Sequence, residues 1–391
     1  MNKKKLAILF IAKNIPTPTK ESNRIVFDIA HHLSDFCNIE FLFPKEIVPF
    51  WLRNKSKFKY LKELSKSWKF EGFRVHPIPY IKLPFKKMQF WTLFRLSRKA
   101  KEIVQNSMID LVHAHYLFPD GYIAYRIFRK YDIPYVLTFR NQDRQYLEII
   151  SKKNPDYKKA AQILMHAKSV LVTNLGYKNF IENRFDINCE IVPHGIEKEV
   201  FDVPIPGKTD NKIIVTTIAD TLETKNVDWV IRAFKDYSGT EDIELYVIGD
   251  AINRKELFEL ANNDNRLKFY GRIPREQVLN LLRESDIFAL PSSRETFGLV
   301  YLEAAATKNA LIGYKGEGVW GVFEDHHEML FCNNFEEFKE KLFFTLNSAG
   351  DRMKLQNNAF LKAKEMEWES IKKMYLDVYK KAMEKDNSSS S

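Results

Sequence analysis

Asp286-Ile-Phe-Ala-Leu-Pro-Ser-Ser-Arg-Glu-Thr-Phe-Gly-Leu-Val-Tyr-Leu-Glu303 is the stretch of sequence that decides the fold. It opens with a short apolar run, which is typical of a strand buried inside a parallel sheet. A Phe-Gly corner follows, and the residues after it have the composition of a helix start. Ligands of open α/β sheets gather outside the carboxyl ends of the strands. The stretch therefore predicts a parallel α/β sheet with a binding site at this strand end.

Two carboxylates, Glu295 and Glu303, flank the corner eight positions apart. Carboxylates accept hydrogen bonds from sugar hydroxyls, and the free amides of a helix N-terminus attract phosphate oxygens. Two glutamates at this spacing more often form a solvated helix face. The preceding strand favours the other interpretation, a site for a ligand that is both polyhydroxylated and phosphorylated, such as a nucleotide sugar.

The alternation of apolar and helix-like runs continues outward in both directions. Later strands are expected at residues 213–218, 245–248, 267–270 and 287–290, with helices at 227–234, 255–261 and 278–282. Earlier strands are expected at residues 6–12, 39–43, 111–113, 135–139, 170–173 and 190–192, with helices at 23–33, around 122–128 and from 158. The predicted fold class is α/β, with two Rossmann-like αβα domains facing across a cleft.

The chain of 391 residues is long enough for two domain cores. We expect an N-terminal domain at 1–203 and a C-terminal domain at 204–366. The polar, Pro- and Gly-rich stretch 203–211 is interpreted as the linker between them. A last helix is expected at 367–385, followed by a disordered tail at 386–391.

Three cysteines, Cys37, Cys189 and Cys332, lie far apart in apolar runs, which indicates unpaired thiols in a reducing compartment. The apolar run near the N-terminus ends at Lys13 without a small-residue cleavage site, so we interpret it as the first buried strand. The sequence has no uncharged apolar stretch long enough to span a bilayer. We therefore expect a cytoplasmic protein, either soluble or peripheral on the inner face of the cell membrane.

Positive charge is concentrated between Lys45 and Glu102, where 16 Lys and Arg stand against four Glu. Twelve aromatic residues are interleaved with these charges. The pattern suits an anionic membrane surface, where the rings enter the interface and the cations meet lipid headgroups. It would also suit single-stranded nucleic acid, or be an ordinary solvated face whose rings belong to the core. We favour the membrane surface and expect no nucleic-acid partner.

Several motifs together give the chain a family resemblance. Leu290-Pro-Ser, Glu295-Thr-Phe-Gly298 and Glu303-Ala-Ala resemble the donor motif of retaining glycosyltransferases of the family 4 type, which have the two-domain GT-B fold. Val192-Pro-His-Gly-Ile-Glu197, Asp110-Leu-Val-His-Ala-His115 and Val247-Ile-Gly-Asp250 resemble further motifs of that family. The resemblance covers most of the chain and is weakest between about residues 45 and 105. It implies that the domain at 1–203 binds the acceptor, that the domain at 204–366 binds the donor, and that the helix at 367–385 crosses back to the first domain.

The resemblance implies a role for each matching residue. It implies that Glu295 contacts the donor sugar, Glu303 the ribose hydroxyls, and the backbone of Phe297 to Leu299 the diphosphate. The predicted catalytic residues are His115, Lys225 and Glu295. The predicted donor-binding residues are Gly195, Gly249, Asp250, Thr296, Phe297, Gly298, Leu299, Glu303, Gly316 and Gly318.

Two of these roles have physical support of their own. His115 follows a predicted strand end, where a neutral imidazole would hydrogen-bond a sugar hydroxyl, although a lone histidine is often structural. Lys225 precedes a predicted helix, so its ammonium would join the helix N-terminus in binding one diphosphate, unless it is a plain surface lysine.

The chain also departs from the family pattern. Five positions before the lysine the family usually has Arg, whereas this chain has Asp220, which should slow diphosphate departure unless Arg294 or Lys315 supplies the charge. The loop at residues 15–23 has no glycine where the family commonly has a Gly pair. Other departures are Lys308 and Ala310 in place of Gly and Pro, and Arg140-Asn141 in place of His-Gly.

The resemblance implies a retaining glycosyltransferase that moves a sugar from a nucleoside-diphosphate sugar to a saccharide or lipid-linked acceptor, in surface polysaccharide or glycolipid assembly. The sequence contains no Asp-x-Asp pair and no His/Cys cluster, which agrees with a reaction that needs no metal and no other cofactor. Three alternatives stay open. They are a catalytically impaired relative that binds a nucleotide sugar or a partner, a basic nucleic-acid-binding protein, and a nucleotide-sugar epimerase of similar architecture.

Overall fold

The structure is a computed structural model, and it describes residues 5–17, 24–47, 67–81, 96–204, 212–218, 223–250 and 254–384. Most of the basic segment 45–102, part of the loop 15–23, most of the linker, Asp220 and the tail 386–391 lie outside the described residues. The chain divides into two compact units. Unit 1 comprises Met1–Val172, Tyr177–Val192 and Lys372–Ser391, and unit 2 comprises Thr173–Gly176 and Pro193–Ile371.

Unit 1 is built on an eight-stranded sheet with the strand order β3-β4-β2-β1-β5-β6-β7-β8. Neighbouring strands are parallel except β3 and β4, which are antiparallel. The strands are β1 (Leu6–Ile11), β2 (Cys37–Ile47), β3 (Trp68–Phe70), β4 (Phe73–Ile81), β5 (Leu111–Ala114), β6 (Tyr135–Thr138), β7 (Ser169–Val172) and β8 (Glu190–Ile191).

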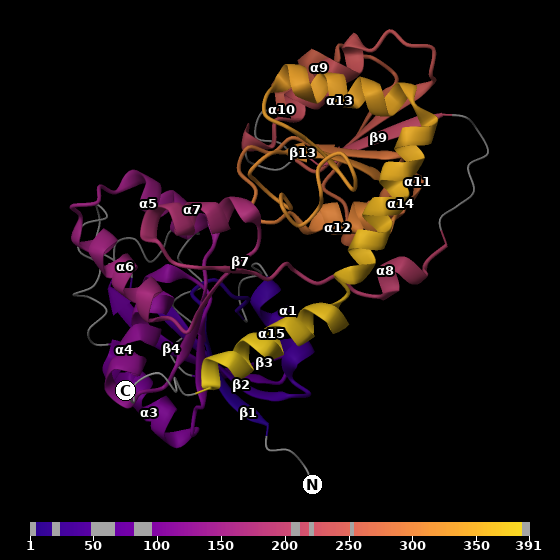
Figure 1. Ribbon diagram of the computed structural model, residues 1–391. Coiled ribbons are helices and arrows are strands. Elements are labelled where there is room, and N and C mark those ends of the chain that lie inside the picture. Colours follow the sequence, from indigo (N-terminus) through magenta and orange to yellow (C-terminus); the bar gives the residue numbers. More distant parts are fainter. Residues whose placement is uncertain are drawn as a thin grey trace. The chain divides into compact units, whose positions relative to one another are not determined.

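The two faces of the unit 1 sheet are covered by different helices, because successive strand side chains point to opposite faces. Leu9 and Ile11 of β1 belong to a core shared with the helices labelled α3, α4 and α6 in Figure 1. Phe10, between them, faces the other side, where Phe27 of α1 stacks on Phe41 with ring centroids 4.5 Å apart. The helices are α1 (Ile25–Leu33), α3 (Leu96–Asn106), α4 (Tyr122–Tyr131), α5 (Asn141–Ile149), α6 (Pro155–His166) and α7 (Leu175–Phe185).

Unit 2 is built on a six-stranded parallel sheet with the strand order β11-β10-β9-β12-β13-β14. The strands are β9 (Ile213–Ile218), β10 (Ile243–Ile248), β11 (Leu267–Gly271), β12 (Ile287–Leu290), β13 (Ala310–Tyr314) and β14 (Leu330–Cys332). The chain runs from β9 outward to β11 and then returns to β12 on the other side of β9. The carboxyl ends of β9 and β12 therefore form a topological switch point, which is where such sheets bind ligands.

Helices cover both faces of the unit 2 sheet. Figure 1 shows α9, α10 and α13 on one face and α11, α12 and α14 on the other. The helical elements are α8 (Glu199–Asp202), η5 (Glu223–Lys225), α9 (Val227–Asp236), α10 (Arg254–Ala261), α11 (Arg275–Glu284), α12 (Leu299–Ala306), α13 (Phe335–Asn347) and α14 (Ala349–Glu365). The last helix, α15 (Trp368–Met383), begins in unit 2, and its residues from Lys372 onward belong to unit 1.

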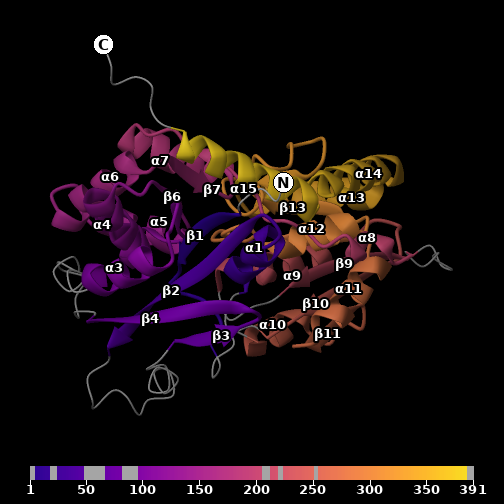
Figure 2. The ribbon, with the colours of Figure 1, turned by 90° about the horizontal axis from the view of Figure 1, so that it is seen from below.

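The part of α15 that belongs to unit 1 packs on the same sheet face as α1, as both ribbon views show (Figures 1 and 2). The Tyr379 hydroxyl and His113 Nδ1 are 2.7 Å apart, and both side chains are buried. Helix α15, late in the sequence, thus packs into the core of unit 1, which also contains the first strand, β1.

The predicted fold class, two parallel α/β sheets, is confirmed, and every expected strand is present within a few residues. The sequence pattern did not predict β3, β4, β13, β14, α3, α5, α7, α8, α13 or α14. The prediction of unpaired cysteines is also confirmed, since Cys37, Cys189 and Cys332 are free and buried. Among the described residues, no helix has both the length and the apolar character needed to cross a membrane.

Candidate active site

The switch point of unit 2 brings together Lys225, at the end of η5, and Glu295, in the loop after β12. The Lys225 ammonium donates a hydrogen bond to Glu295 Oε2. Both side chains are largely buried, at 13% and 14% exposure. A buried ion pair depends on both partners, because either charge alone would be costly. Two residues 70 positions apart in sequence, each predicted to contact the donor, are therefore neighbours.

Helix α12 begins beside this ion pair with unused backbone donors. Gly298 is its N-cap and adopts a left-handed conformation with φ +76°. The amides of Phe297, Gly298 and Leu299 donate no hydrogen bond to any residue that the structure describes. Free amides at a helix N-terminus and the positive end of the helix dipole favour an anion.

The Phe297 corner is held in place by two other segments of unit 2, one with Thr173 and Asn174 and one with His194. Thr173 Oγ1 and Asn174 Nδ2 each donate to the Thr296 carbonyl at 3.0 Å. The Phe297 ring is buried and meets the His194 imidazole edge to face, with centroids 4.9 Å apart. Such fixed support keeps the free amides pointing in one direction, which preorganised binding requires.

The loop after β13 adds Glu317, which the sequence analysis did not predict. Glu317 is 9% exposed, and its Oε2 accepts a hydrogen bond from the Glu295 amide at 3.2 Å. The amide of Gly318 donates to the Glu295 carbonyl at 3.1 Å. The backbone on both sides of Glu295 is thus fixed by this loop, so the Gly318 amide is already engaged. A Cβ at Gly316 would meet open space.

Glu303, predicted to contact ribose, is one turn into α12 and pairs with Arg275 at the start of α11. Arg275 Nε and Glu303 Oε1 are 2.6 Å apart, with the arginine 60% exposed and the glutamate 12% exposed. A ribose would therefore compete with an exposed guanidinium for this carboxylate. Exposed arginines lose little on rearrangement, since such pairs contribute at most about 1 kcal/mol.

Three further predicted residues of unit 2, Gly195, Gly249 and Asp250, differ in what surrounds them. Gly249, with φ +99°, and Asp250 follow β10 at the same sheet edge as the ion pair. The Gly249 amide donates to the Gly271 carbonyl at 2.7 Å. Gly195 instead packs on the Trp368 indole, which a Cβ would meet at 2.3 Å. The role that the structure gives Gly195 is therefore close packing.

His115 belongs to unit 1 and is completely buried after β5. Its ring lies 4.1 Å from the His113 ring and 4.7 Å from the Phe10 ring, centroid to centroid. His113 points to the same face and is bonded on both nitrogens, to Tyr379 Oη at 2.7 Å and to Thr138 Oγ1 at 2.8 Å. Burial, reinforced by the Arg140 guanidinium, lowers the pKa of His113 to about 3. His113 is therefore a neutral structural residue.

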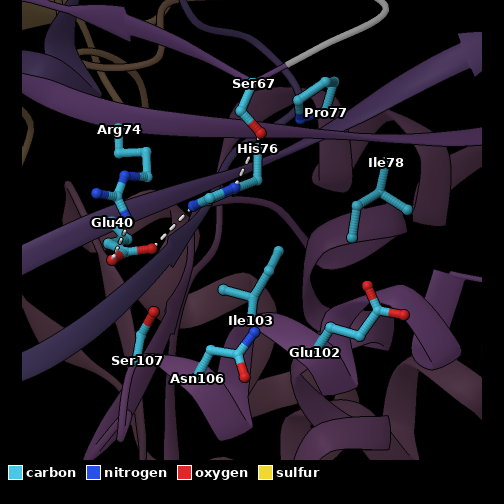
Figure 3. Close-up of a pocket in the computed structure, with 10 residues that line it drawn as sticks. All are labelled: Glu40, Ser67, Arg74, His76, Pro77, Ile78, Glu102, Ile103, Asn106 and Ser107. Carbon is cyan, nitrogen blue, oxygen red and sulfur yellow. Dashed lines mark hydrogen bonds and ion pairs between the residues drawn. The ribbon is translucent and has the colours of Figure 1, made fainter.

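Unit 1 also holds a separate polar cavity of about 460 Å³ between α3 and the strands β2 and β4 (Figure 3). His76 Nε2 lies 2.8 Å from Glu40 Oε2, and its Nδ1 lies 3.1 Å from Ser67 Oγ. Serine, imidazole and carboxylate in this order resemble a hydrolytic relay. However, Arg74 Nη1 lies 3.6 Å from the other Glu40 oxygen, and Ser67 is exposed. We therefore interpret this network as one that stabilises the edge of the sheet. It includes no predicted site residue.

Comparison with known proteins agrees with this geometry. The family described as "Glycosyltransferase Family 4" matches residues 51–200, and "Glycosyl transferases group 1" matches residues 200–362. The chain is 25% identical over 312 residues to "Uncharacterized glycosyltransferase MJ1178" of Methanocaldococcus jannaschii, covering 78% of this chain and 85% of the relative. It is 24% identical over 342 residues to "Alpha-monoglucosyldiacylglycerol synthase" of Acholeplasma laidlawii, covering 79% and 86%.

Solved structures match nearly the whole chain. Sucrose-phosphate synthase from Thermosynechococcus elongatus gives a TM-score of 0.71 at 15% identity, covering 96% of this chain and 98% of that one. Anabaena Alr3699/HepE in complex with UDP-glucose gives 0.63 at 16% identity, covering 96% and 99%. These neighbours define the class of the fold, GT-B. The chain belongs to the family 4 type of GT-B glycosyltransferases.

Proposed function

We propose that the protein is a retaining glycosyltransferase that moves a sugar from a nucleoside-diphosphate sugar to a saccharide or lipid-linked acceptor without a metal ion. The observation that carries the proposal is the Lys225–Glu295 ion pair beside the free amides of the α12 N-terminus, at the switch point of unit 2. The Anabaena neighbour was solved with UDP-glucose, so uridine diphosphate sugars are the first donors to test.

In this proposal the donor diphosphate lies at the N-terminus of α12 and takes the Lys225 ammonium away from Glu295. The released Glu295 carboxylate accepts hydrogen bonds from hydroxyls of the donor sugar, and Glu303 accepts them from the ribose. As the bond to the sugar breaks, negative charge grows on the leaving phosphate. Lys225 and the α12 amides stabilise that charge more in the transition state than in the ground state, which accelerates the reaction.

A leaving phosphate oxygen takes the proton of the acceptor hydroxyl, so the proposal needs no separate carboxylate base. Unit 2 then holds the donor, and unit 1 holds the acceptor. His115 is proposed to hydrogen-bond a hydroxyl of the donor sugar during turnover, which requires its buried ring to become accessible.

The acceptor class rests on the relatives. The Acholeplasma relative is named an alpha-monoglucosyldiacylglycerol synthase. Two other relatives are named a putative teichuronic acid biosynthesis glycosyltransferase and a phosphatidylinositol N-acetylglucosaminyltransferase subunit. We propose a glycolipid or surface-polysaccharide acceptor, reached from the cytoplasmic face of the membrane. The basic, aromatic segment 45–102 is proposed to hold the enzyme at anionic lipid.

Two variants test the site. A panel of UDP-, GDP- and ADP-sugars is first screened by thermal shift, because a ligand that binds only the folded state raises the melting temperature. We expect Lys225→Ala to weaken binding of both the nucleoside diphosphate and the sugar nucleotide. Glu295→Gln should bind the nucleoside diphosphate at least as tightly as wild type, since the ammonium no longer has a competing carboxylate.

Both variants should transfer sugar at least about 100-fold more slowly than wild type, as losses of a charged transition-state contact do. Lys255→Ala, which alters an exposed lysine of α10 in the same unit, is the matched control and should behave as wild type. Normal transfer by both site variants would refute the proposed site.

A catalytically impaired relative is the second candidate, and Asp220 motivates it. A carboxylate in place of the usual cation should disfavour a leaving diphosphate. Wild-type protein that binds a donor saturably but neither hydrolyses nor transfers its sugar would select this candidate over the enzyme.

A further inference from the structure

A second group of charged residues lies at the carboxyl edge of the unit 1 sheet, on loops that follow three neighbouring strands. Lys13 follows β1, Tyr116 and Asp120 follow β5, and Arg140 follows β6. We call these four residues the Tyr116 cluster, because both cations face the Tyr116 ring. The Lys13 Nζ atom lies 4.5 Å from its centroid and the Arg140 Cζ atom lies 5.6 Å from it.

The two cations of the cluster lie near Asp120 and Asp143, but their side chains bond to backbone carbonyls. Arg140 is 4% exposed, its Nε donates to the His115 carbonyl at 3.1 Å, and its buried Nη2 has no hydrogen-bond partner. Lys13 is half-buried, and its ammonium donates to the Phe118 carbonyl at 2.8 Å. Within the described part of the chain, neither cation forms an ion pair, in contrast to Lys225.

The nearby acids, Asp120 and Asp143, form their hydrogen bonds with backbone amides. An Asp143 oxygen accepts the Arg140 amide at 3.0 Å and so is committed to the start of α5. Burial holds the pKa of Asp120 well above its usual range. Its Oδ2 accepts the Lys13 amide at 3.2 Å, and its buried Oδ1 has no partner. Both carboxyls thus accept hydrogen bonds from backbone amides and not from the side chains of the two cations.

Buried donors without partners are rare and costly, so such a group indicates a missing partner. A guanidinium and an ammonium together favour an oxyanion, because both form short charge-assisted hydrogen bonds with phosphate or carboxylate oxygens.

We propose that Lys13 and Arg140, set on the Tyr116 ring, form an anion subsite that holds a phosphate or carboxylate group of the acceptor. The inference rests on the proposed function and narrows its acceptor to acidic molecules.

Binding of glucose 6-phosphate and of glucose, measured by calorimetry on the full chain, tests the subsite. For wild type we expect glucose 6-phosphate to bind at least tenfold more tightly than glucose, the ratio that one charge-assisted hydrogen bond supplies. Lys13→Met and Arg140→Met should abolish this preference, and Arg140→Lys should keep part of it. Lys130→Met, an exposed lysine of α4, is the matched control.

Two further variants and a second probe make the outcome decisive. Lys225→Ala should keep the preference for glucose 6-phosphate, because it alters only the donor site. If Lys225→Ala loses this preference and Lys13→Met keeps it, the proposed subsite is wrong. Lys13 is half-buried, so its variant stays informative if Arg140→Met does not fold. Competition by phosphatidylglycerol vesicles, and not by phosphatidylcholine vesicles, assigns the anion to a lipid headgroup; no competition assigns it to a soluble sugar acid.

The inference and the proposed function fail separately. Donor binding and donor hydrolysis are both measured in the absence of an acceptor, and both depend on unit 2. Absent donor binding would refute the glycosyltransferase proposal. Normal donor turnover, with equal binding of glucose 6-phosphate and glucose, would refute the anion subsite alone.

Discussion

At the scale of single residues, His113 in β5 and His115 directly after it show that two histidines of one short motif have different surroundings. His113 is bonded on both ring nitrogens within unit 1, and burial lowers its pKa to about 3. His115 stacks on it, and its carbonyl accepts Arg140 Nε. Sequence reasoning named His115 and passed over His113, because alternation along a strand does not reveal which partners a buried ring finds.

The lowered pKa of His113 predicts a pH dependence of stability. The unfolded imidazole protonates near its ordinary pKa of about 6.5, while the folded one stays neutral. Its contribution to stability is therefore complete above about pH 6.5 and is lost as the pH falls toward 3. The loss amounts to at most about 1.4 kcal/mol per pH unit.

Urea unfolding of wild type and His113→Gln between pH 7.5 and 5 measures this contribution. Burial raises the pKa of Asp143 to about 6 and that of Asp120 as well. Such carboxyls bind protons more readily when folded, so they raise stability as the pH falls and oppose His113. The wild-type-minus-variant difference isolates the histidine and should shrink with falling pH. A difference that is constant with pH would contradict the assignment.

At the scale of elements, the loop and first turn of α12 decide the candidate site. Gly298 at φ +76° turns the chain so that the amides after Phe297 are free. A Cβ there would meet the Tyr301 ring at 2.8 Å. Gly298→Ala should lower the free energy of unfolding by about 1–3 kcal/mol through strain and weaken donor binding.

Gly350→Ala is the matched control for this change. Gly350 lies in the first turn of α14, and a Cβ there would meet nothing within 4 Å. Alanine suits a helix better than glycine by up to about 1 kcal/mol, so this variant should be as stable as wild type or more so. Equal urea midpoints for the two variants would show that the α12 turn is not strained by a side chain.

The elements missed from the sequence are those whose local signals were weak or misleading. Strand β4 contains Pro77 and Pro79, which argue against a strand, and β14 has three residues, too few to show a period. Strands β9 to β12 have four to six residues, most of them apolar, and were predicted. Local pattern thus identified the switch-point strands that carry the candidate site.

The residues of the candidate site were easier to predict than the contacts between them. Lys225, Glu295 and Glu303 were predicted singly, but the ion pair across 70 positions, the Arg275 partner of Glu303 and the support from Glu317 were not. Each of these contacts joins loops from different strands. They depend on strand order, which the sequence pattern does not contain.

At the scale of the whole molecule, the two ends of the chain form one core in unit 1. The segment of α15 from Lys372 onward buries Tyr375, Val378 and Tyr379 against the face that carries Phe10 and His113. The Tyr379–His113 hydrogen bond spans 266 positions. The loss of its hydroxyl would leave a buried imidazole nitrogen without a partner.

Tyr379→Phe should therefore destabilise unit 1 by about 1–3 kcal/mol, the usual cost of a buried polar group left unpaired. Because unit 2 has its own core, we expect the affinity for the donor nucleotide to change little. Lys380→Ala alters the next residue of α15, whose side chain is 74% exposed, and should leave stability within about 0.5 kcal/mol of wild type. Urea unfolding compares the three proteins. Equal losses in both variants would mean that α15 stabilises unit 1 through its helix as a whole and not through this hydrogen bond.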